Sequence, residues 1–253
     1  MAARLLILGA KGGVGLHCAR RVLELDSVVA VASGRGATEH EMLNKMLGVA
    51  GPTRLELLNL DVTDATALEA AVGNCDAAIF CCSAASSANN AAVDDQAPGV
   101  LGRLCAAAGV PVVQCSSQLV DPKNRWSPIR ILINTIAWGK MDAKFAGEQK
   151  MRASGARYVI LRPGRLEDGE LNRGSCSLGQ NDSVGNYMPQ NGSTRADVAN
   201  ALVTIALHAV AEQQHPLQLT VEMGCESVPS PISGSAEEVR KDIVAQLAAL
   251  KAD

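Results

Sequence analysis

The chain has 253 residues, of which 47% are hydrophobic, and its formal net charge is −3. This length and apolar content predict one sizeable core and a single domain over residues 1–253. The small negative charge, without a basic block, argues against a nucleic-acid partner or an anionic membrane surface. No apolar run reaches the roughly 18 residues that a transmembrane segment needs.

Apolar runs typical of buried strands alternate with stretches of helical periodicity along most of the chain. Such runs, joined by helices, predict an α/β fold: a Rossmann-type doubly wound parallel sheet with helices on both faces and a small C-terminal substrate-side extension. The expected strands are residues 4–10, 28–33, 54–61, 75–84, 111–117, 157–166 and 217–223. The expected helices are residues 13–25, 37–49, 63–73, 92–109, 138–154, 194–210 and 235–251, with an irregular stretch between 117 and 138.

The first expected strand ends in GAKGGVG, residues 9–15, where a glycine recurs at every third position. In a strand–turn–helix unit, Gly9 permits the tight turn, Gly12 lets the backbone approach a pyrophosphate, and Gly15 lets helix and strand pack closely. Backbone N–H groups and a helix N-terminus then point at one anion. The segment therefore predicts a dinucleotide site, and the alternative is a glycine-rich turn that binds no ligand.

The end of the second strand bears on which dinucleotide binds. NAD-binding sites usually carry an Asp or Glu there, which accepts a hydrogen bond from the ribose 2′-OH. This chain has Ser33, Gly34 and Arg35 at that point, and Lys11 lies in the glycine turn. Ser33, Arg35 and Lys11 could bind a 2′-phosphate, which a carboxylate would repel. We therefore expect NADP(H) rather than NAD(H), unless Arg35 and Lys11 are ordinary solvated cations.

Further contacts are expected at the carboxyl ends of the third and fourth strands. Asp61 and Val62 follow the third strand and could hold an adenine ring through one side chain and one backbone amide. Ser83 and Ala84 follow the fourth strand and would line the same crevice, because ligands of such sheets bind at the carboxyl ends of the strands. Asp61 could equally be only the cap of the next helix.

Five segments carry a resemblance: GAKGGVG (9–15), DVTD (61–64), QCSSQLV (114–120), KFAGEQKMRASGARYVILRPGRL (144–166) and TRADVA (194–199). Together they resemble the atypical short-chain dehydrogenase/reductases of the NmrA-like, NAD(P)-binding type. Similar proteins include plant NADP-binding proteins, a plastid import component, and flavin or biliverdin reductases. With the reduced cysteines that the sequence predicts, the resemblance implies a soluble protein in a reducing compartment, either the cytoplasm or the plastid stroma.

The resemblance implies catalytic roles for two residues. Lys144 corresponds to the lysine that contacts the nicotinamide ribose, and Ser117 to a serine presented to the substrate, although Ser117 could equally just satisfy a strand end. Tyrosine-dependent members carry their proton donor four residues before the lysine, where this chain has Lys140. The usual acid is therefore missing. A reductase would need another donor, or a substrate such as a flavin or quinone that takes its proton from water.

The same resemblance places the turn after the sixth strand against the nicotinamide carboxamide. Residues 167–193 are polar and rich in glycine and asparagine, so we expect them to form a loop that covers the substrate side. The residues expected at the dinucleotide site are Gly9, Lys11, Gly12, Gly13, Val14, Gly15, Ser33, Arg35, Asp61, Val62, Ser83, Ala84, Lys144, Pro163, Gly164 and Leu166.

The chain has eight cysteines and four histidines. The cysteines form no CxxC pair and the histidines are isolated, so we expect no metal site. Most cysteines lie in apolar patterns, which predicts buried, reduced thiols. Cys176 lies in a polar segment and is the one candidate for an exposed thiol.

Three other residues allow two interpretations each. Arg162 ends an apolar strand, so it should have either an ion-pair partner within the core or an anionic ligand. Trp126 and Trp138, the only tryptophans, should either anchor the core or form a wall for a flat substrate.

Two functions fit these observations. The first is an NADPH-dependent oxidoreductase for a small flat or conjugated substrate of the flavin, quinone or enone type. The alternative is a non-catalytic NADP-binding redox sensor or assembly subunit, which Lys140 in place of tyrosine favours. A sugar-nucleotide epimerase is the weaker third candidate, because it too needs the tyrosine and the chain is short for a substrate domain.

Overall fold

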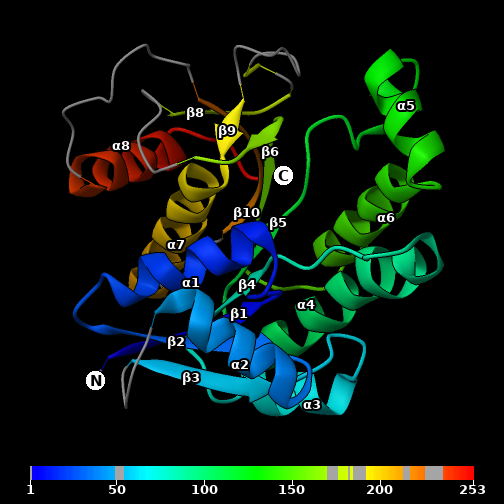
Figure 1. Ribbon diagram of the computed structural model, residues 1–253. Helices are drawn as coiled ribbons and strands as arrows, with labels where there is room; N and C mark the ends of the chain where they lie inside the picture. The colour runs from blue at the N-terminus through cyan, green and yellow to red at the C-terminus, as the bar shows by residue number, and fades with distance from the viewer. Residues whose placement is uncertain are drawn as a thin grey trace.

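The central sheet has eight strands in the order β3-β2-β1-β4-β5-β6-β10-β8 (Figure 1). All neighbouring pairs are parallel except β10 and β8. This computed structural model describes residues 2–48, 54–169, 176–181, 183–184, 192–212, 217–225 and 236–253. The strands are β1 (Ala3–Leu8), β2 (Val28–Gly34), β3 (Leu55–Asn59), β4 (Ala77–Phe80), β5 (Val112–Cys115), β6 (Tyr158–Pro163), β8 (Cys176–Gly179) and β10 (Gln218–Cys225), and a separate pair consists of β7 (Leu166–Glu167) and β9 (Ser193–Thr194).

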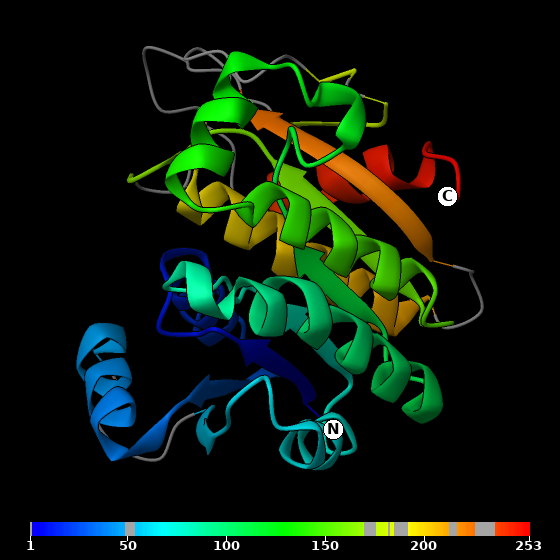
Figure 2. The same ribbon diagram turned by 90° about the vertical axis from the view of Figure 1, so that its right-hand side faces the viewer.

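Helices cover both faces of the sheet (Figures 1 and 2). None of the described helices is long and apolar enough to cross a membrane. One face carries α1 (Gly13–Leu23), α2 (Gly36–Leu47), α7 (Arg195–Ala211) and α8 (Ala236–Ala248). The other face carries α3 (Ala65–Val72), α4 (Ala97–Ala108) and α6 (Lys140–Arg152).

Alternate side chains of β1 enter the two halves of the core. Leu5 and Ile7 pack toward α1 and α7, whereas Leu6 and Leu8 pack toward α3 and α4. The strands are therefore apolar on both sides, as a sheet between two helical layers requires. The structure confirms the predicted doubly wound α/β fold.

The strand order reverses between β1 and β4. From β1 the chain builds outward through β2 to β3, and from β4 it builds in the opposite direction through β5 to β6. The loops that leave the carboxyl ends of β1 and β4 therefore diverge and leave a crevice between them, which is where such sheets bind ligands.

Two expectations about irregular segments are wrong. A further helix, α5 (Pro128–Ile136), lies in the stretch expected to be irregular, and it begins with proline at a position where the missing N–H costs nothing. Strand β8 lies inside the expected loop 167–193, because it finds a partner in β10, far along the chain. Parts of that range, residues 170–175, 182 and 185–191, lie outside the described residues.

The two tryptophans flank α5 and are exposed. Trp126 and Trp138 each retain 77% of their accessible surface. The interpretation that they anchor the core is therefore wrong.

Arg162 lies at the buried end of β6 and has a carboxylate partner. Its guanidinium donates to both oxygens of Glu148 on α6, at 3.0 and 2.5 Å. Burial alone would lower the pKa of Arg162, but the hydrogen bonds and charge of Glu148 outweigh it and raise the pKa. The expected ion pair within the core is confirmed.

Replacing Glu148 with glutamine should leave the buried Arg162 charge without its hydrogen-bonded carboxylate, since Asp121 and Glu222 act on it only through their charge. We expect Glu148→Gln to lower the free energy of unfolding by about 3 kcal/mol in urea titrations. The matched control is Glu56→Gln, which breaks the exposed pair with Arg4 and should cost less than about 1 kcal/mol. Equal losses in the two variants would contradict this account of Arg162.

Candidate functional site

The glycine turn joins β1 to α1 and sits at the reversal of strand order. Gly9 has φ +83°, and a Cβ there would lie 3.0 Å from the backbone of Cys81 and Cys82. A Cβ at Gly15 would overlap the carbonyl oxygen of Gly9. Gly12 is the N-cap residue of α1, and its N–H donates to the Gly9 carbonyl at 2.9 Å. Only glycine at 9 and 15 lets the start of α1 lie so close to the ends of β1 and β4.

A cavity of about 490 Å³ opens beside this turn. It extends along the carboxyl ends of β2, β3 and β4, so it occupies the crevice that the strand order creates. Its volume lies within the ordinary range for small-molecule sites. Of the residues predicted for the dinucleotide site, nine line it: Gly9, Lys11, Gly12, Ser33, Arg35, Asp61, Val62, Ser83 and Ala84.

The remaining predicted residues lie outside this lining. Val14 and Gly15 are buried in the first turn of α1, and a Cβ at Gly13 would lie 2.6 Å from the Arg195 side chain. The other predicted residues, on the β5 and β6 side of the sheet, are Ser117, Lys144, Pro163, Gly164 and Leu166.

Ser117 and the turn after β6 meet at the carboxyl edge of the sheet. The N–H groups on either side of Ser117 donate to β6: Ser116 to Leu161 at 2.7 Å and Gln118 to Pro163 at 2.9 Å. Gly164 in turn donates to Met223 of β10 at 3.1 Å. The structure thus brings Ser117 beside Pro163 and Gly164, and leaves Ser117 half-buried.

Sequence reasoning missed Glu39, which lines the cavity from the first turn of α2. Its carboxylate accepts from the Arg35 N–H at 2.7 Å, and both Lys11 Nζ and Arg35 Nη2 lie 3.3 Å away. Burial would raise the pKa of Glu39, but these donors and their charges lower it below its usual range. Strand β2 itself ends without an acidic residue, and Glu39 comes five residues after that end. The only sequence signal for Glu39 was its spacing of four residues from Arg35, which puts the two side chains on the same side of a helix.

Asp61 faces the same end of the cavity. Its Oδ1 accepts from the Thr63 side chain at 2.7 Å and the Thr63 N–H at 2.9 Å, which lowers the pKa of Asp61. Arg35 Nη1 lies 3.9 Å from its other oxygen. The cap of α3 is Asp64, whose carboxylate accepts from Thr66 and Ala67. The alternative that Asp61 only caps the next helix is therefore wrong.

Lys144 joins the cavity wall through a buried carboxylate. Its Nζ lies 3.1 Å from Asp94, whose other oxygen accepts from the Ala84 N–H at 2.9 Å. Asp94 belongs to a π-helical turn, η2 (Asn90–Gln96), which precedes α4 where one continuous helix was expected. Such turns are often found at functional sites. The predicted residues Lys144 and Ala84 are thus held by one shared partner that the sequence did not reveal.

Lys140 occupies the position of the missing tyrosine and is bonded to the backbone. Its Nζ donates to the Ala84 carbonyl at 2.7 Å. Lys140 therefore supports the same segment as Asp94.

Two cysteines, Cys81 and Cys82, are among the residues that line the cavity. Burial raises the pKa of the Cys82 thiol to about 12. The pKa of Cys81 is also raised well above its usual value, in a site where its thiol contacts those of Cys115 and Cys18. Because both thiols stay protonated near neutrality, neither is a ready nucleophile or acid.

Arg195, the first residue of α7, is a second residue that the sequence analysis did not select. Its side chain packs over Gly13 and pairs with Asp168 Oδ1 at 2.5 Å. A cation therefore stands beside the start of α1. The sequence analysis used the segment TRADVA as part of the family resemblance and as the start of a helix, but assigned no role to its arginine.

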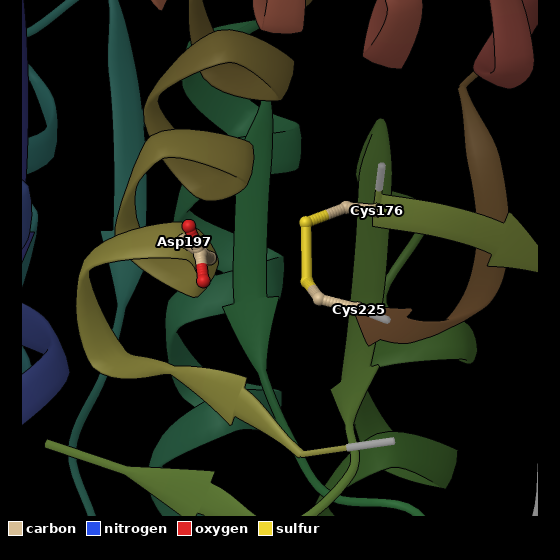
Figure 3. A group of neighbouring side chains, drawn as sticks. All are labelled: Cys176, Asp197 and Cys225. Carbon is tan, nitrogen blue, oxygen red and sulfur yellow. A yellow bond between two sulfur atoms is a disulfide. The ribbon is translucent and has the colours of Figure 1, made fainter. Parts of the chain in front are cut away.

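The expectation that Cys176 is an exposed thiol is wrong. Register pairs Cys176 in β8 with Cys225 in β10, and the two buried residues form a disulfide that faces the first turn of α7 (Figure 3). Their sulfur atoms and an Asp197 carboxylate oxygen lie within 4.8 Å of one another. Both sulfurs are used by the disulfide, so the cluster offers no thiolate to a metal ion.

The comparisons identify the family of the chain. The sequence profile of the NAD(P)H-binding family matches residues 9–209, so the chain belongs to this family of nicotinamide dinucleotide-binding proteins, which fits the atypical short-chain dehydrogenase/reductase resemblance. A search of curated proteins found no match.

Solved structures share the fold at low sequence identity. The oxidoreductase ylbE from Lactococcus lactis is 17% identical with a TM-score of 0.70, over 96% of this chain and 97% of that one. ChuY, an anaerobillin reductase from Escherichia coli O157:H7, is 22% identical with a TM-score of 0.66, over 91% and 100%. A short-chain dehydrogenase/reductase from Veillonella parvula in complex with NADP is 16% identical with a TM-score of 0.65, over 91% and 97%.

The cysteine pairing gives a direct chemical prediction. Protein purified without reductant, denatured and alkylated should carry six modifications, because six cysteines are free and two are joined. After reduction the intact mass should show all eight cysteines of the sequence modified. Eight modifications without reductant would contradict the disulfide.

Proposed function

We propose that this chain is an NADP(H)-dependent oxidoreductase that acts on a small flat or conjugated substrate of the flavin, quinone or enone type. The observation that carries the proposal is the glycine turn, which opens onto a cavity that Lys11 and Arg35 also line. A reductase and an NADP complex among the structural neighbours support it by analogy of fold.

The residues present suit a dinucleotide. The N–H groups of Gly13 and Val14 at the start of α1 would donate to the pyrophosphate, which the backbone of Gly12 would approach. Asp61 with Val62 would border the adenine. Lys11 and Arg35 would turn from Glu39 toward a 2′-phosphate. In the free protein, Glu39 pairs with Lys11 and Arg35, and Asp61 lies near Arg35. The negative charge of Glu39 would repel a 2′-phosphate, so it would lower the affinity for NADPH relative to NADH.

The nicotinamide end would lie toward β5 and β6. Lys144, fixed by Asp94, would hold the ribose, while Pro163, Gly164 and Leu166 would border the carboxamide and Ser117 would orient the substrate. The bound coenzyme supplies the hydride. Lys140 is committed to the Ala84 carbonyl, and the thiols at the cavity hold their protons tightly. A substrate that takes its proton from water suits this set of residues better than a simple ketone.

A specific observation favours a second function, that of a non-catalytic NADP-binding sensor or assembly subunit. Lys140 replaces the tyrosine acid, and its side chain is hydrogen-bonded to the carbonyl of Ala84 in the cavity wall. The two functions differ in turnover. An oxidoreductase oxidises NADPH when a flavin, quinone or enone is added, and the alternative binds NADPH without oxidising it across that panel.

The coenzyme preference is tested by removing a cation. Arg35→Gln should weaken NADPH binding about tenfold in calorimetry, because a charge-assisted bond to the 2′-phosphate is lost. Binding of NADH, which lacks that phosphate, should change little. The control is Arg103→Gln, at an exposed position of α4. An equal effect on both coenzymes would contradict the assignment of Arg35.

Replacing Glu39 tests the coenzyme preference by removing the carboxylate that pairs with the two cations. Glu39→Gln removes a negative charge and frees Lys11 and Arg35, so NADPH should bind about fivefold tighter. If the carboxylate instead serves the ribose 2′-OH of NADH, the same variant binds NADH more weakly and NADPH no better. Calorimetry with both coenzymes separates these outcomes, and the second one would overturn the NADP(H) proposal.

A further inference from the structure

Helix α5 presents an apolar face to solvent. Leu132 and Ile136 are 58% and 71% exposed, and Ile129 and Ile131 are also exposed. The helix lies at the outer edge of the molecule beside α6 (Figure 1). We call the following set the α5 surface: Trp126, Ile129, Ile131, Leu132, Ile136 and Trp138.

The inward face of the same helix is polar. The buried guanidinium of Arg130 donates to the carbonyls of Leu119 and Asp121 at 2.8 and 2.7 Å and pairs with Asp142. One turn later, Asn134 donates to Asp142 at 2.8 Å and accepts from the Met141 N–H at 2.9 Å. These bonds fix α5 to the rest of the protein through its polar side.

The orientation of α5 is the reverse of that of an ordinary surface helix, which buries its apolar stripe and exposes its polar one. The spacing of Ile129, Leu132 and Ile136 puts them on the side opposite Arg130 and Asn134. The two indole rings alone expose on the order of 300 Å² of surface. An exposed apolar patch of this kind indicates a binding surface rather than scattered surface residues.

Charge and residue type indicate what binds there. Lys123 and Arg125 are exposed just before the helix, and the Arg125 guanidinium lies 5.5 Å from the Trp126 ring centroid. Asp142 is already paired with Arg130, so the border of the patch is cationic in a chain of net charge −3. Tryptophan at both ends of a short apolar helix, with adjacent cations, is the pattern of a helix lying in a lipid interface.

We propose that the α5 surface docks on a bilayer surface that contains anionic lipid. This local surface departs from the expectation, drawn from the net charge of the whole chain, that an anionic membrane surface is not a partner. A two-fold contact between two copies would bring the same patch, with its own Lys123 and Arg125, against itself. Anionic headgroups attract these cations instead, while the apolar side chains enter the boundary between headgroups and acyl chains. The proposal does not depend on the coenzyme or the reaction.

The native tryptophan fluorescence reports on the α5 surface alone, because Trp126 and Trp138 are the only tryptophans in the sequence. We expect a blue shift on adding phosphatidylcholine vesicles with about 30% phosphatidylglycerol. Brominated lipid in those vesicles should quench the emission. Pure phosphatidylcholine vesicles should bind more weakly, and salt should reduce the difference.

Variants of the exposed side chains sharpen the test. Leu132→Gln combined with Ile136→Gln should weaken vesicle binding about tenfold. The matched control is Met42→Gln with Met46→Gln, at exposed apolar positions of α2, which should bind as the wild type does. Arg125→Gln should weaken binding to the anionic vesicles roughly fivefold. Circular dichroism and urea titration verify the fold of each variant.

Three outcomes would overturn the proposal. The first is no shift and no quenching of the wild-type protein with either vesicle, a result that needs no variant. The second is vesicle binding that the Leu132 and Ile136 substitutions leave unchanged. The third is a blue shift that grows with protein concentration in the absence of lipid while light scattering shows a doubled mass, which would assign the surface to a second copy of the chain.

Discussion

The close approach of α1 to the end of β1 is the constraint on which the site depends. A Cβ at Gly15 would overlap the Gly9 carbonyl, and one at Gly9 would crowd the backbone after β4. Because these two positions lack side chains, the first turn of α1 sits at the point where the strand order reverses. Its free N–H groups and helix dipole then act on the same crevice. Any widening at this turn would separate the anion-binding amides from the walls of the cavity.

A network of charges and backbone contacts builds the rest of the site around that turn. At one end, the Glu39 carboxylate pairs with both Lys11 and Arg35, so a coenzyme 2′-phosphate bound as proposed would compete with this carboxylate for the two cations. At the other end, Ala84 is held on both sides, by Asp94 at its N–H and by Lys140 at its carbonyl. Lys140 has therefore taken on a supporting role at the position where a proton donor was expected. The family match supports dinucleotide binding, and the position of Lys140 is the reason why the proposed reaction uses a substrate that takes its proton from water.

Local patterns predicted more of this molecule than long-range ones. The apolar runs and the glycine turn indicated the parallel sheet and nine lining residues, because both signals depend on neighbouring residues. The pairing of Cys176 with Cys225 could not be foreseen, since it depends on two cysteines 49 residues apart meeting through the register of their strands. Asp94 was missed because a π-helical turn directs it toward Lys144. Helix α5 was missed because Arg130 and Asn134 face inward, which inverts the usual pattern.

The central claim is that the glycine turn and its cavity bind a dinucleotide with its phosphates at the start of α1. A crystal structure of the protein with NADP tests it most directly. The account predicts pyrophosphate oxygens within hydrogen-bond distance of the N–H groups of Gly13 and Val14, with the 2′-phosphate between Lys11 and Arg35. Nucleotide bound elsewhere on the molecule, or a glycine turn left empty at saturating coenzyme, would contradict it.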